Sequence, residues 1–204
     1  MFGVLRIFIG FVLGAVAFLL IFKFAKTQMK KRLSIITALA VVVLITVLGF
    51  VPIENLVYSF QSAEDVYEYY YNSQEKPNLV IEGNQSDLVV GQENNTSTLL
   101  IVPKTDSGWK IGIGLNTKKI VQKIHNGIVI CVYKHKNTHD YYVTVLNTNG
   151  GGLNITDAYD TEFYPSKNNN NFLGKSFVTY YAHVADYNSQ YSIVVDGNKV
   201  EVNQ

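Results

Sequence analysis

The chain lacks a second cysteine, so no disulfide can form within it. Its one thiol, Cys131, lies in the apolar segment GIVICVY. Such neighbours predict a small buried hydrophobic residue, because a catalytic thiol needs a cationic and partly exposed setting. A chain without disulfides fits a bacterial exterior better than an oxidising secretory lumen.

A basic surface is lacking from most of the chain. Residues 54–204 hold eleven basic and sixteen acidic residues, which gives them a net charge of −5. Proteins bind nucleic acid largely through Lys and Arg against phosphate, so this composition argues against a nucleic-acid partner. It equally disfavours binding to anionic lipid headgroups.

Charge is absent from two long stretches near the N-terminus, residues 7–22 and residues 33–53. About 20 apolar residues in a helix cross a hydrocarbon core about 30 Å thick. Backbone groups in lipid must bond within their own segment, which requires a helix. The sequence therefore predicts a transmembrane helical hairpin in residues 1–53, with helices at about 4–25 and 33–53. No small-x-small cleavage site follows the first stretch, so we expect an uncleaved helix.

Cations gather in the ten residues that join the two stretches. They are Lys23, Lys26, Lys30, Lys31 and Arg32. Short loops rich in Lys and Arg stay on the cytoplasmic side of a membrane. We therefore expect a two-pass protein of the cell membrane with this loop cytoplasmic. The N-terminus and everything after Pro52 would then lie outside. The opposite orientation requires the cation cluster to cross the membrane.

Gly10 and Gly14 stand four residues apart in the segment GFVLG, so they share one face of a helix. Small residues at this spacing let two helices approach closely. One interpretation is a dimerisation face for another chain. The interpretation we favour is packing against the second helix of the same hairpin, because that helix is already adjacent.

The remaining residues change from helical to strand periodicity. SAEDVYEYYYN, which begins at Ser62, predicts a short capped amphipathic helix within a juxtamembrane segment, residues 54–76. From Pro77 onward, short runs rich in Val, Ile, Tyr and Thr alternate with turn signals such as Asn126-Gly127 and Asp196-Gly197. This pattern predicts a mainly antiparallel β domain in residues 77–204, built as a sandwich, a barrel-like sheet or a curved meander.

The segment HKNTH offers a candidate metal site. His135 and His139 are four residues apart and Asp140 follows, and these residue types bind zinc. The spacing suits a helix, but the flanking segments ICVYK and YYVTV read as strands, and Lys134 and Lys136 oppose a bound cation. We therefore interpret the segment as a hairpin turn and assign no metal ligands.

A second candidate is hydrolytic. His183 has Asp186 nearby in sequence, and Ser176 or Ser189 offers a hydroxyl, but no strand–turn–helix nucleophile elbow surrounds them. The glycine-rich segments GWKIGIGL and TNGGGLN lack the following helix that a phosphate loop needs. We assign no catalytic residue and no cofactor, and an enzyme is the less favoured interpretation.

Three segments resemble segments of other proteins: F-x-S-x-E-D-x-Y-x-Y-Y from Phe60 to Tyr70, VPKTDSGWKI and YSIVVDGNKVEV. Together they are similar to small, uncharacterised membrane-anchored proteins of low-GC Gram-positive bacteria. The resemblance covers most of residues 58–204. It implies a membrane anchor and brings no activity with it.

Three functions are therefore open. The first is a non-enzymatic module that binds a membrane protein, a peptide or a wall component outside the lipid bilayer that anchors it. Exposed Tyr in the tyrosine runs would suit contact with a partner or a sugar, and an equal alternative is that helix and loops cover both faces of the sheet. The second is a metal-dependent or hydrolytic enzyme that uses His135, His139 and Asp140, or His183. The third is an accessory subunit that binds a membrane partner through its helices, with Gly10 and Gly14 at the contact.

Overall fold

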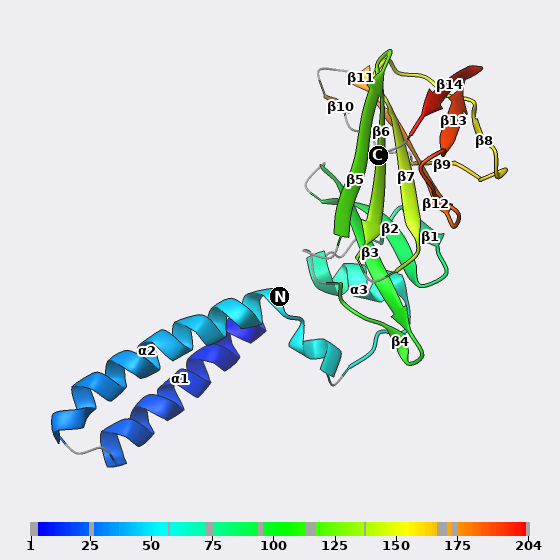
Figure 1. The fold of residues 1–204 in the computed structure, drawn as a ribbon. Coiled ribbons are helices and arrows are strands. Elements are labelled where there is room, and N and C mark those ends of the chain that lie inside the picture. Colours follow the sequence, from blue (N-terminus) through cyan, green and yellow to red (C-terminus); the bar gives the residue numbers. More distant parts are fainter. Residues whose placement is uncertain are drawn as a thin grey trace.

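The computed structural model shows a helical hairpin joined to a β-rich domain (Figure 1). The structure describes residues 4–24, 27–56, 58–71, 76–93, 96–112, 117–136, 138–166, 171–172, 175–202. Within these ranges only the backbone is described for residues 4–7, 24, 27–31, 48–50, 93, 171–172, 175–176.

Helices α1 (Val4–Phe24) and α2 (Thr27–Phe50) lie side by side and run antiparallel. A Cβ atom added to Gly10 would lie 2.7 Å from Ile45 Cγ1, and one added to Gly14 would lie 2.9 Å from Val41 Cγ2. Both glycines therefore face α2 of the same chain at a distance that no larger residue could keep without displacing its neighbour. Helix α2 begins six residues before the predicted position, because Thr27 to Arg32 includes good helix formers despite its charge.

The prediction that residues 1–53 form a transmembrane hairpin is wrong. Within the part of the chain that the structure describes, no helix is long and apolar enough to cross a membrane.

The two-pass localisation in the cell membrane, with its inside loop and outside termini, is corrected for the same reason. The five basic residues between the two apolar stretches were predicted to mark the cytoplasmic loop, and that prediction depended on the same localisation. Lys23 lies in the last turn of α1, and Arg32 lies in α2. Lys26 lies outside the described residues, and the side chains of Lys30 and Lys31 are not described.

A short segment, residues 51–56 and 58–71, connects the hairpin to the β domain, and we call it the neck. It contains a 3₁₀ helix, η1 (Ile53–Leu56), and the helix α3 (Ala63–Tyr71). Ser62 Oγ accepts a hydrogen bond from Asp65 N at 3.1 Å, which is the predicted N-terminal cap. Ala63, Val66 and Tyr67 are buried against the first sheet, so this short helix depends on packing for its stability.

The β domain is mainly antiparallel, as the sequence predicts. Its first sheet has the strand order β1-β2-β3-β4, and each strand pairs with the next along the chain. The strands are β1 (Leu79–Glu82), β2 (Ser86–Glu93), β3 (Thr96–Thr105) and β4 (Gly108–Trp109). Strand β1 lies at one edge of this sheet.

The second sheet has the order β5-β6-β7-β12-β9, so a late strand inserts beside β7. Its strands are β5 (Thr117–His125), β6 (Ile128–His135), β7 (Tyr141–Asn147), β12 (Val178–Val184) and β9 (Tyr164–Ser166). Asn126 and Gly127, which connect β5 to β6, have φ angles of 48° and 76°, as a tight hairpin turn requires.

Two smaller sheets complete the domain. One pairs β13 (Ser192–Val195) with β14 (Asn198–Glu201) and with β8 (Ile155–Asp157). The other is the pair β10 (Asn171–Phe172) and β11 (Lys175–Ser176). The main core lies between the second sheet and β13, around Ile130, Val143 and Ile193, all of which are fully buried. A further cluster, which includes Leu88 and Tyr142, packs the first sheet onto the second.

Candidate functional site

Asp140, the residue before β7, lies at the centre of a buried polar network. Its carboxylate accepts hydrogen bonds from Asn84 N at 2.9 Å, Gln85 N at 2.7 Å and Ser86 Oγ at 2.9 Å. It also pairs with His183 Nε2 at 2.9 Å. Burial alone would raise the pKa of Asp140, but the hydrogen bonds from His183, the two backbone amides and Ser86 outweigh it and hold that pKa well below its ordinary value.

His183 reaches this carboxylate from the neighbouring strand. In the register of β7 and β12, His183 stands opposite Tyr142, so its ring lies beside the start of β7. The Tyr142 hydroxyl donates to Ser86 O at 2.7 Å, and burial raises the pKa of Tyr142 far above its usual value. The network therefore ties the β1–β2 turn of the first sheet to the second sheet.

The same turn is held from its other side by Asp87. This carboxylate pairs with Lys104 Nζ at 2.8 Å and accepts a hydrogen bond from Trp109 Nε1 at 2.6 Å. Lys104 also donates to Gly83 O at 2.9 Å. Because Asp140 and Asp87 hold the turn together, the turn and the end of β1 are fixed in position.

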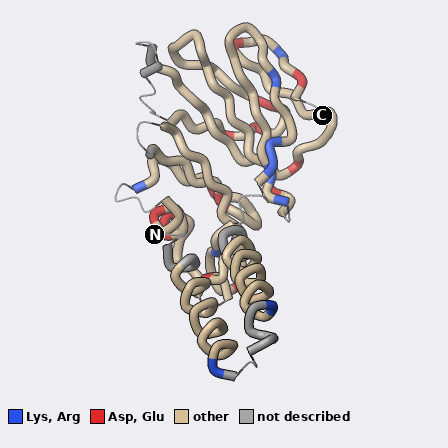
Figure 2. Tube along the Cα trace, turned by 90° about the vertical axis from the view of Figure 1, so that its left-hand side faces the viewer, with Lys and Arg blue, Asp and Glu red and all other residues tan. Residues whose placement is uncertain are grey.

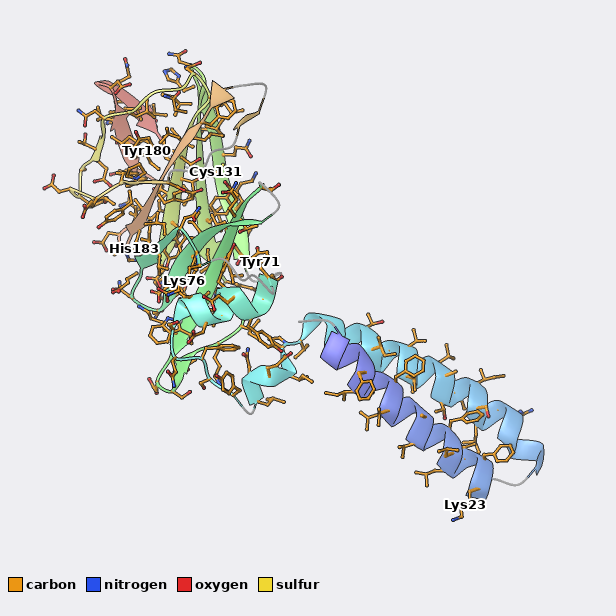
Figure 3. The ribbon with its side chains drawn as sticks, turned by 180° about the vertical axis from the view of Figure 1, so that it is seen from behind. Lys23, Tyr71, Lys76, Cys131, Tyr180 and His183 are labelled. Carbon is orange, nitrogen blue, oxygen red and sulfur yellow. The ribbon has the colours of Figure 1, made fainter. Side chains whose placement is uncertain are left out.

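A groove of about 660 Å³ opens beside β1, and we call it the acidic groove. Its lining comes from β1, from the loop between β8 and β9 and from the end of β12, where Figure 3 labels His183. The lining residues are Leu79, Val80, Ile81, Glu82, Tyr159, Thr161, Glu162, Tyr164, His183, Val184, Ala185 and Asp186. Three of these described residues carry carboxylates and none is Lys or Arg.

Aromatic side chains stand among the carboxylates of the acidic groove. Tyr159 is 46% exposed and Tyr164 is 37% exposed, so both rings are accessible to a ligand. The Tyr164 hydroxyl donates to Glu162 Oε2 at 2.6 Å, which orients that carboxylate and raises the pKa of Tyr164. Negative charge next to exposed tyrosine faces is an arrangement that suits a cation.

Strand β1 presents an open hydrogen-bonding edge to the acidic groove. Gly83 N donates to Ser86 O at 2.9 Å, and pairs in an antiparallel ladder alternate. Ile81, opposite Leu88, and Leu79, opposite Val90, therefore bond toward β2. The backbone N–H and C=O groups of Val80 and Glu82 therefore point away from β2, which is the strand that pairs with β1 in the described residues.

A second hollow, which we call the neck cavity, lies between the neck and the β domain. It has a volume of about 790 Å³ and is lined by Val51, Pro52, Asn55, Leu56, Asn84, Gln85, Pro103, Lys104, Thr105, Asp106, Lys110, Ile111, Gly112, His135 and Thr138. His135 is 4% exposed, and neither ring nitrogen has a hydrogen-bond partner among the described residues. Burial lowers the pKa of His135, which favours the neutral form of its ring.

The structure separates the residues of the candidate metal site. Asp140 pairs with His183, His135 lines the neck cavity, and His139 is exposed and donates its backbone N–H to Gln85 Oε1 at 2.8 Å. In the described part of the chain, no group of three or more metal-ligating side chains comes together. The alternative of a metal-dependent enzyme on these residues thus loses its geometric support.

The hydrolytic candidate is rearranged as well. The carboxylate partner of His183 is Asp140 and not Asp186, which is exposed on the acidic groove. Ser189 is exposed, the side chain of Ser176 is not described, and the described hydrogen bonds of His183 include no serine hydroxyl. Within the described residues, the pair links β12 to the Asp140 network.

The hairpin exposes apolar side chains on its outer surface. Figure 2 shows charge on the described hairpin only near its loop end. The exposed large residues are Phe8, Phe11, Val12, Leu13, Val16, Phe18, Leu19, Leu20, Phe22, Ile35, Ile36, Leu39, Val42, Val43 and Val47. An apolar surface of this extent is typical of an interaction site.

Comparisons with family models, with curated proteins and with solved structures found no match to this chain. The function is therefore inferred from the two hollows, the hairpin surface and the residues that line them.

Proposed function

We propose that the chain is a binding module that takes up an extended basic segment of a partner protein in the acidic groove. One observation carries this proposal: a groove with three carboxylates and no cation among its described lining runs beside an open strand edge. The groove selects positive charge, and the edge of β1 selects an extended backbone.

Backbone pairing supplies the first part of the interaction. An extended peptide that lies along β1 can bond to the outward N–H and C=O groups of Val80 and Glu82, as in other cases of strand addition. Successive peptide side chains then point to opposite faces, so every second one enters the acidic groove. The fixed β1–β2 turn lowers the ordering cost of binding, because the edge is already in place.

Charge supplies the second part. A Lys or Arg of the peptide would lie near Glu82, Glu162 or Asp186, and its cationic group can also stack on Tyr159 or Tyr164. Exposed ion pairs contribute about 0.2–1 kcal/mol each, so the groove charges affect mainly specificity and association rate. A peptide of the same length whose Lys and Arg are replaced by neutral residues is expected to bind more weakly.

Fluorescence anisotropy with a labelled ten-residue peptide rich in Lys and Val tests the proposal. Glu162→Gln with Asp186→Asn should weaken binding about 2- to 25-fold, since each lost pair corresponds to up to about 5-fold. The matched control, Glu201→Gln on β14, removes an exposed acid that does not line the groove and should leave binding unchanged. Equal binding of a Glu-rich peptide, or equal loss with the control variant, would overturn the proposal.

The exposed hairpin supports a second candidate function, attachment to an apolar partner protein through α1 and α2. Gly14 faces Val41 inside the hairpin, so a substitution there tests the hairpin itself. The exposed residues Phe11 and Leu39 are the better positions, and Phe11→Ser with Leu39→Ser should reduce co-purification of the partner. Binding of the unmodified chain to protein-free lipid vesicles, with no protein recovered, would contradict a protein partner.

A further inference from the structure

His135 is buried in a way that folding alone does not explain. It ends β6 at the wall of the neck cavity, where neither imidazole nitrogen finds a partner among the described residues. An unsatisfied buried polar group costs about 1–3 kcal/mol, and an imidazole carries two such nitrogens. Native structures keep few groups of this kind, and each one requires an explanation such as a bound ligand.

Two lysines line the same cavity. Lys110 Nζ donates to Asn55 O at 2.9 Å and to Tyr58 O at 2.8 Å. Lys104 Nζ is held by Asp87 and by Gly83 O. An ammonium group has three donors, so each lysine keeps one N–H beyond these acceptors.

Ammonium groups outnumber carboxylates in the described lining of the neck cavity. Lys104, which pairs with Asp87, and Lys110 are the cations of its described lining, and Asp106 is the acid of that lining. Asn55, Asn84, Gln85 and Thr138 add neutral polar groups to the lining. This character is opposite to that of the acidic groove, so the two hollows would take different ligands.

The wall beside His135 is kept open by a glycine. A Cβ atom at Gly112 would lie 2.9 Å from Ile101 O and 3.8 Å from His135 Nε2. Thr138 N and Thr138 Oγ1 both donate to His135 O, at 3.1 Å and 3.2 Å, and so fix the backbone that carries the ring. The imidazole is therefore positioned, uncovered by a side chain at residue 112 and without a partner.

We propose that the neck cavity binds a small oxyanion, a carboxylate or phosphate group, which accepts hydrogen bonds from His135 and from the ammonium groups of Lys104 and Lys110. This site is separate from the acidic groove and does not depend on the peptide function. Because the neck supplies one wall of the cavity, binding of the anion would also join the neck to the β domain.

NMR of the full chain tests this site directly, because the chain has four histidines and their ring signals can be followed separately. The probes are inorganic phosphate and acetate, each titrated near pH 7 at constant ionic strength with sodium chloride. We expect a saturable shift of the His135 ring signals, while the exposed His125 and His139 do not move. Saturation with only one of the two probes supports the site and identifies the anion.

Variants separate the site from a general salt effect. Lys110→Met should weaken the His135 response at least 5-fold, whereas Lys199→Met, at an exposed position on β14, should leave it unchanged. His135→Phe should abolish binding and raise the thermal unfolding temperature of the ligand-free protein, because it removes two unsatisfied nitrogens. A shift that fails to saturate, or that affects all exposed histidines alike, would show an adventitious ion only and overturn the proposal.

Discussion

The hairpin and the β domain differ in the size of the side chains that they bury. In the hairpin, glycines face the seam between α1 and α2, and Phe and Leu face outward. In the β domain, Ile, Val and Tyr fill the interior, and a polar network lies where the two main sheets meet. The difference shows that the β domain contains its own core, whereas the hairpin leaves most of its apolar surface for something else to cover.

The largest expected effect tests the β domain. Asp140→Ala removes the acceptor of four hydrogen bonds, one of them buried and three part-buried. We expect the free energy of unfolding in urea to fall by about 3–5 kcal/mol. Asp186→Ala removes a carboxylate from an exposed position and should change stability by less than about 0.5 kcal/mol. Similar losses for both variants would mean that the network does not stabilise the fold.

Acid titration sharpens the same point. The pKa of Asp140 is lower in the folded chain than its ordinary value of 3.8, so its contribution is present above pH 3.8. That contribution is lost as the pH falls from this value toward the folded pKa. The stability difference between the unmodified chain and Asp140→Asn should therefore be full at about pH 6 and shrink below 3.8. A difference that grows in acid would contradict the assigned direction.

An intermediate effect tests the hairpin seam. Gly14→Leu would force Val41 away and separate α1 from α2, at a cost of about 1–3 kcal/mol to the hairpin. Leu13→Ala changes an exposed neighbour and should cost less than about 0.5 kcal/mol within the chain. Helical content by circular dichroism during thermal unfolding distinguishes them. Equal unfolding temperatures would show that the seam is not tightly packed.

Local signals predicted much of this molecule. The Ser62 cap, the Asn126-Gly127 turn and the antiparallel strands follow from residues close together in sequence. The predicted membrane span was wrong, since no described helix meets the length and apolarity that a span requires. The apolar composition predicted the two helices, but it did not predict what contacts their exposed apolar side chains.

Nonlocal pairing was beyond the sequence. Strand β12 inserts between β7 and β9, and only this arrangement places His183 beside Asp140, 43 positions earlier in the chain. Spacing instead grouped Asp140 with His135 and His139, which point to different surroundings. The acidic groove likewise combines residues from β1, from the loop after β8 and from the end of β12. Their charges are visible in the sequence, but their proximity is not.

Hydrogen exchange of backbone amides with and without the Lys- and Val-rich peptide tests the proposed function most directly. The account predicts that the peptide slows exchange at Val80 and Glu82, whose N–H groups face the open edge, and leaves Leu79 and Ile81, which already bond to β2, nearly unchanged. Unchanged exchange at Val80 and Glu82 under saturating peptide would contradict strand addition at β1.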